Sequence, residues 1–192
     1  MNTRLLEFIF NPEKTFEKTK KEGWKQPFIF FTASLLFIAL VTPLFNVMGV
    51  RNTDLTSSLQ SQILAYKIAE AILPTYGSVV FMFMPTWIVF FSFIILPITA
   101  LIIHIIYKKI LKGTGTFTDA LRCACYGIAP CVIGGYIPII SVFLAVYSVF
   151  MQFYIFPKIA YKTENINSLI VLVGVMSIII MELFIFGSTI IV

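Results

Sequence analysis

KKILKGTGTFTDALRCACYGIAPCVIGGY, residues 108–136, is a basic and polar turn between two long apolar runs. Most of the remaining chain is hydrophobic: 59% of all residues are hydrophobic, only 12% are charged, and the mean hydropathy is +0.95. Soluble domains carry about 25% charged residues. The composition therefore predicts an integral membrane protein, with residues 1–192 forming one membrane-embedded domain.

Two apolar runs precede this turn. The first is uncharged from Gln26 to Val50, a length of 25 residues, which is enough to cross a bilayer. The second covers residues 79–107 and contains Pro85 and Pro97, which predict a kinked helix because proline cannot donate a backbone hydrogen bond. The segment between the runs, Arg51 to Gly77, is more polar, and either a second amphipathic helix or a simple connector fits it.

The run after the turn is too long for one ordinary span. It is uncharged for 35 residues, from Cys123 to Pro157. Gly134-Gly135 followed by Pro138 predicts a turn that divides it into two short spans. The predicted fold is therefore all-α and polytopic, with five transmembrane helices, at about 27–49, 79–106, 119–135, 138–157 and 168–191.

Residues 1–25 hold six of the fourteen Lys and Arg residues, interleaved with apolar side chains. Asn11-Pro12-Glu13 there predicts a helix start, and an amphipathic helix on the membrane surface is expected. Four more cations lie in residues 108–122 and two at Lys158 and Lys162. Five spans place these 12 on one side and only 2 on the other. The positive-inside rule then predicts a cytoplasmic N-terminus and an outside C-terminus.

The polar turn has local signals of its own. Gly113 and Gly115 are expected to let the chain reverse, and Thr116 to cap a helix that begins at Phe117 with Asp119 at its third position. Two interpretations stay open, a well-capped helix start at the interface or a turn that binds a partner or a lipid headgroup. The other candidate residues of this turn are Arg122 one turn further on, Phe117 and Tyr126 as interface anchors, and Pro130 as a bend in the third helix.

Glu182 is the ionisable residue that lies deepest in an apolar run. A charge at such a depth costs about 2.5–3.5 kcal/mol on insertion scales, so this side chain is expected to face other helices. It is predicted either to join helices by hydrogen bonds or to form a proton or ion site. Its candidate partners are Gln152, Tyr147 and Tyr154, or His104 and Arg122, with His104 also fitting an interfacial cap.

Catalytic and metal-binding signatures are not found in the sequence. It has no Gly-x-Ser-x-Gly, no His-Glu-x-x-His and no Walker loop, and it contains one histidine. Cys123, Cys125 and Cys131 lie against an apolar run and are interpreted as small hydrophobic residues. No enzyme activity, cofactor or metal is therefore expected. The basic residues adjoin apolar runs, which indicates lipid headgroups and not nucleic acid.

Several short motifs, in this order and spacing, resemble the Yip family, the Ypt/Rab-interacting membrane proteins and their bacterial and archaeal relatives. They are Asn11-Pro12 with Thr15-Phe16, the turn Gly113–Phe117 followed by Asp119-Ala120-Leu121, and Tyr126-Gly127-Ile128-Ala129-Pro130. The resemblance implies a multi-pass protein without catalytic chemistry, associated in eukaryotes with small GTPases, vesicle budding and membrane shaping. Only Gln26-Pro27 stands where eukaryotic members carry Asp-Leu-Tyr-Gly-Pro, and their long cytoplasmic extension is missing, so a prokaryotic-type member is expected and GTPase binding is not carried over.

Two functions follow as hypotheses. The first is a membrane scaffold or adaptor that contacts lipids and a protein partner at the cytoplasmic face. The alternative is a small-solute or ion transporter or channel that uses Glu182 and the second span, with a homo-oligomer as one arrangement.

Overall fold

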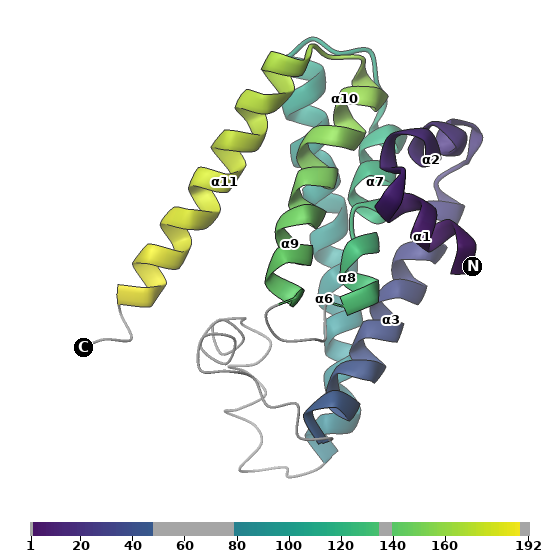
Figure 1. The fold of residues 1–192 in the computed structure, drawn as a ribbon, viewed down its shortest axis with the longest axis vertical. Coiled ribbons are helices and arrows are strands. Elements are labelled where there is room, and N and C mark those ends of the chain that lie inside the picture. The colour runs from purple at the N-terminus through teal and green to yellow at the C-terminus, as the bar shows by residue number, and fades with distance from the viewer. Residues whose placement is uncertain (1, 48–78, 135–139, 189–192) are drawn as a thin grey trace.

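The computed structural model describes residues 2–47, 79–134 and 140–188, and every regular element in these ranges is helical (Figure 1). The predicted all-α class is therefore confirmed for the described residues. The segment 51–77, for which a helix or a connector was expected, lies outside them.

The N-terminal segment forms two short helices before the first long one. They are α1 (Asn2–Phe10) and α2 (Pro12–Lys18), and a 3-10 turn (Thr19–Lys21) links them to α3 (Lys25–Val47). Pro12 occupies the first turn of α2, as the sequence predicts. The helix start predicted at Asn11-Pro12 is therefore confirmed, and a separate helix, α1, precedes it.

The second long helix is α6 (Val79–His104), which continues through a π-helical turn (Ile105–Ile110). Pro85 and Pro97 both lie inside α6, so neither proline ends the helix. The Leu111 amide bonds the Ile106 carbonyl at 3.0 Å, one residue further back than in an α-helix. This extra turn carries the helix beyond the predicted end of the span.

The predicted third span is two helices and not one. They are α7 (Phe117–Tyr126) and α8 (Ala129–Gly134), and at 10 and 6 residues neither is long enough to cross a bilayer alone. Pro130 has no N–H for the Tyr126 carbonyl, and the Ser148 hydroxyl donates to the Gly127 carbonyl at 2.6 Å. Pro130 therefore contributes to a break after α7, where only a bend was predicted.

The last two predicted spans also form helices. α9 (Ile140–Phe150), a π-helical turn (Met151–Ile155) and α10 (Phe156–Tyr161) follow one another without a break. After a short turn comes α11 (Asn165–Ser188), which leans away from the other helices in Figure 1.

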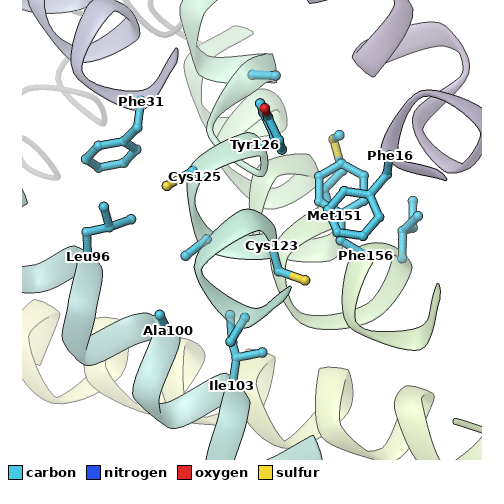
Figure 2. Close-up of a cluster of buried hydrophobic side chains, with 14 of the residues drawn as sticks. Phe16, Phe31, Leu96, Ala100, Ile103, Cys123, Cys125, Tyr126, Met151 and Phe156 are labelled. Atoms are coloured by element: carbon cyan, nitrogen blue, oxygen red, sulfur yellow. The ribbon is translucent and has the colours of Figure 1, made fainter. Parts of the chain in front are cut away.

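The core surrounds α7, whose side chains are mostly buried between α3, α6 and α10. Figure 2 shows Cys125 on the side of α7 that faces Phe31 of α3 and Leu96 of α6. The segment that follows the basic turn is therefore the centre of the packing.

In the described part of the chain, two helices are long and apolar enough to cross a membrane, Phe93–Ile110 and Val142–Tyr161. Two shorter apolar helices are Lys25–Ile38 and Asn165–Met181. Large apolar side chains remain exposed along these helices, among them Ile29, Ile95, Ile98, Phe143, Ile170, Val173 and Ile178. Soluble monomers rarely expose so much contiguous apolar surface, and lipid is its natural solvent.

Candidate functional site

The helix start predicted at Thr116 is present. The Thr116 side chain accepts a hydrogen bond from the Asp119 amide at 3.4 Å, and the Asp119 carboxylate accepts from the Thr116 amide at 2.8 Å. These reciprocal bonds form a capping box at the N-terminus of α7. Two backbone donors that would otherwise lack partners are thereby satisfied.

Asp119 also pairs with a buried arginine. Its second carboxylate oxygen lies 3.1 Å from Arg122 Nη1, and the Arg122 side chain is only 9% exposed. Arg122 Nε is buried and has no hydrogen-bond partner among the described residues. The guanidinium therefore depends on Asp119 for its charge compensation.

Tyr161, which was not predicted as a site residue, holds the turn before α7 through hydrogen bonds. Its hydroxyl donates to the Thr116 carbonyl at 3.0 Å and lies 2.8 Å from His104 Nδ1. Because the phenol has one proton, His104 must donate to it, so the proton of a neutral His104 ring is on Nδ1. The Tyr161 carbonyl accepts from the Thr114 amide at 3.0 Å.

Gly113 and Gly115 are required for close approach. A Cβ on Gly115 would lie 2.7 Å from the Tyr161 ring, and one on Gly113 would lie 2.8 Å from the Tyr161 carbonyl oxygen. The chain reversal itself uses positive φ at Lys112 and Lys162, at 55° and 53°. Gly113 and Gly115 thus permit the close packing of the turn, while the residues with left-handed backbone next to it are lysines.

A second set of contacts holds the N-terminal helices against the rest of the protein. The Phe8 ring stacks on Tyr126 with centroids 4.6 Å apart, and the Phe16 ring stacks on Phe156 at 4.4 Å. The Tyr126 hydroxyl also donates to the Glu22 carboxylate. We call residues 2–22 held in this way the N-terminal cap.

Two predictions about membrane contact, one for the N-terminal segment and one for Tyr126, are wrong. Phe8 and Phe16 are buried in the protein core, whereas the sequence predicted that this segment lies with its apolar side on the membrane. Tyr126 is fully buried and is no interface anchor. Phe117 remains 43% exposed, and Phe10 is 76% exposed on the other side of α1.

Three of the residues proposed around Glu182 bond to other groups. His104 bonds Tyr161, the Tyr147 hydroxyl donates to the Ile9 carbonyl at 3.0 Å, and Gln152 Nε2 donates to the Ala124 carbonyl at 3.5 Å. Glu182 lies within α11, but its side chain is outside the described residues.

The sequence contained a weak signal for Tyr107 and Tyr161. Each stands before a lysine where a long apolar run meets a polar turn. Tyr107 is buried, and its hydroxyl donates to the Phe153 carbonyl. The pattern is typical of an interfacial belt, so it gave no indication that both rings would be packed inside the protein.

Metal-ligating side chains do not gather in the described ranges, where no group of three or more His, Cys, Asp or Glu occurs. The three cysteines are free thiols, and Cys123 and Cys125 are buried. The polar groups described above bond mainly to one another and to backbone carbonyls. Their arrangement fixes the position of the turn and of the N-terminal cap.

These features define a helical membrane protein whose N-terminal helices and polar turn are packed onto one bundle. The family model described as Yip1 domain matches residues 6–188. The chain therefore belongs to the Yip family, as the sequence motifs predicted. No curated protein and no solved structure matches the chain.

Proposed function

We propose that this Yip-family protein is a non-enzymatic membrane scaffold or adaptor with five spans. α3, α6, the broken pair α7 and α8, the joined pair α9 and α10, and α11 would form the spans. In Figure 1, α6 and α10 end where α7 and α11 begin, at the end of the molecule opposite to the end of α3. This alternation and the distribution of Lys and Arg support an inside N-terminus, an outside C-terminus and a cell membrane of the prokaryotic type.

The N-terminal cap is the observation that carries the proposal. Its aromatic side chains Phe8 and Phe16 are buried against the bundle, while the charged side chains of Lys14, Glu17 and Lys18 stay exposed on α2. A further ion pair joins Lys158 to Glu13 at 3.3 Å. A segment packed in this way presents a surface of fixed geometry, which lowers the ordering cost of binding a partner.

The transporter alternative receives no support from the described residues. His104, Tyr147 and Gln152, which were predicted as candidate partners of Glu182, each bond a different group of the protein. The scaffold proposal accounts for these bonds directly, because all three hold helices or the N-terminal cap in place.

Site-specific photo-crosslinking in native membranes tests the proposal. A photoreactive amino acid at Lys14 or Lys18 should yield discrete protein adducts, which include a self-adduct if the partner is a second copy. The same group at Ile98, an exposed apolar position of α6, should yield lipid adducts. Phe16→Ala, which removes the stack on Phe156, should weaken the protein adducts at Lys18.

The opposite result is equally specific. Lipid adducts alone at Lys14 and Lys18, together with solute or proton flux into vesicles that contain the purified protein, would replace the scaffold with a transporter.

A further inference from the structure

Lys112 and Lys162 have an unusual backbone conformation for lysine. Their φ values are 55° and 53°, and they are the non-glycine residues with positive φ in the described ranges. Glycine adopts this conformation without a steric penalty and asparagine tolerates it, whereas lysine gains nothing from it. Each follows the end of a helix, where glycine is the usual residue.

The two lysines lie close together although they are 50 positions apart in the numbering. Gly113, which follows Lys112, is so near Tyr161, which precedes Lys162, that an added Cβ would lie 2.8 Å from the Tyr161 Cβ. The Thr114 amide bonds the Tyr161 carbonyl at 3.0 Å. Because both lysines are exposed, the two turns place two cations with positive-φ backbone at neighbouring positions on the surface.

The nearby carboxylates are fewer than the lysines. Lys108 and Lys109 are exposed on the π-helical turn just before Lys112, and none of the four lysines has an ion-pair partner within the described part of the chain. Of the nearby carboxylates, Asp119 is bonded to Thr116 and Arg122. Glu164 is the other acid on the adjoining turns, and it is exposed.

Exposed apolar side chains beside the lysines indicate where this site lies relative to the membrane. Ile110 is 66% exposed two residues before Lys112, and Phe117 is exposed at the start of α7. In a membrane protein, exposed apolar groups beside exposed lysines indicate the boundary between hydrocarbon and headgroups. A phosphate held here would come from a lipid.

We propose that Lys112 and Lys162 form a binding site for the phosphate of an anionic lipid headgroup. Lys108 and Lys109 add to the positive electrostatic potential at this site. A lysine in place of glycine at both positions costs conformational energy and like-charge repulsion, and a bound anion offsets both. This inference rests on the membrane orientation in the proposed function and adds the lipid class that the cytoplasmic face would recognise.

The test is lipid-dependent thermal stability of the full chain purified in a neutral detergent. Phosphatidylglycerol should raise the melting temperature, and phosphatidylcholine with the same acyl chains should not. Without lipid, Lys112→Gly/Lys162→Gly should unfold at or above the wild-type temperature, because glycine has no steric strain at positive φ. With phosphatidylglycerol, this variant should lose most of the rise in melting temperature, which is called the phosphatidylglycerol increment below. Lys112→Arg/Lys162→Arg should keep it.

A matched control removes the same charge elsewhere. Lys14→Gln/Lys21→Gln alters two exposed lysines of the N-terminal cap and should keep the increment. If the glycine variant keeps the full increment, or the control loses as much, the site is refuted. If inorganic phosphate alone reproduces the increment, the ligand is a soluble anion and the lipid assignment is overturned.

A further variant and the crosslinking result distinguish failure of the lipid site from misfolding and from failure of the adaptor role. If the glycine pair does not fold, Lys112→Asn/Lys162→Asn repeats the test, since asparagine tolerates positive φ. Loss of the protein crosslinks at Lys14 and Lys18 would refute the adaptor role and would leave the lipid increment unaffected.

Discussion

The hydroxyl of Tyr126 donates a hydrogen bond to the carboxylate of Glu22, which precedes it by 104 positions. This bond joins the end of the N-terminal cap to the last turn of α7, beside the stack of Phe8 on the same tyrosine ring. The polar and apolar contacts of one side chain therefore hold the cap on the bundle.

Removal of this hydroxyl should loosen the cap without unfolding the bundle. Tyr126→Phe keeps the ring against Phe8 and deletes the bond to Glu22, and a hydrogen bond to a charged group contributes about 1.5–3 kcal/mol. Faster proteolysis within residues 2–22 and a lower melting temperature are expected. Tyr154→Phe serves as the control, because Tyr154 is partly buried and its hydroxyl makes no hydrogen bond within the described part of the chain. Equal cleavage in wild type and Tyr126→Phe would contradict this role of Glu22.

Gly115 should not tolerate a methyl group. A Cβ there would lie 2.7–2.9 Å from three atoms of the buried Tyr161 ring, which cannot move aside without losing its bonds to His104 and Thr116. Gly115→Ala is expected to destabilise the protein by about 1–3 kcal/mol, the usual cost of overpacking. Thermal unfolding in detergent measures it.

Gly174 provides the matched control for Gly115. It lies within α11, and an added Cβ would meet nothing within 4 Å. Gly174→Ala should leave stability unchanged or raise it by up to about 1 kcal/mol, because alanine is the better helix former. Similar losses at both positions would show that the Tyr161 contact is not the cause.

Gly127 should be coupled to Gln152. A Cβ on Gly127 would lie 2.0 Å from Gln152 Cγ, a contact that joins the break after α7 to the π-helical turn. Gly127→Ala should be destabilising, and Gln152→Ala in the same protein should recover part of the loss because the shorter side chain makes room. A double-mutant cycle is expected to give a coupling of about 0.5–3 kcal/mol. Strictly additive effects would argue against this contact.

The elements that depend on local sequence were predicted correctly. Thr116 and Asp119 are three residues apart, so their capping box follows from spacing alone. Contacts between distant residues were not predictable in this way. Hydrophobic periodicity marks Phe8 and Phe16 as apolar-facing, but it does not distinguish lipid from the protein surface that Tyr126 and Phe156 supply.

The break between α7 and α8 depends in part on a distant residue. The sequence predicted one helix through Pro130, because the run contains no charge. Pro130 contributes locally, and the Ser148 hydroxyl, 21 positions from Gly127, donates to the Gly127 carbonyl at the break. Positive φ at Lys112 and Lys162 was also missed, since lysine carries no local preference for that conformation.

Asp119 should matter more to stability than Thr116, although both belong to the capping box. Thr116→Ala removes one cap and should cost about 1 kcal/mol. Asp119→Ala removes the cap and also leaves the Arg122 guanidinium, 9% exposed, without its carboxylate, for which the expected loss is about 3–5 kcal/mol. Asp119→Ala/Arg122→Met should be more stable than Asp119→Ala alone, because the buried charge is gone and its apolar stem is kept. Chemical denaturation of the four proteins measures the order, and a double variant no more stable than Asp119→Ala would show that Arg122 does not need Asp119 for its charge compensation.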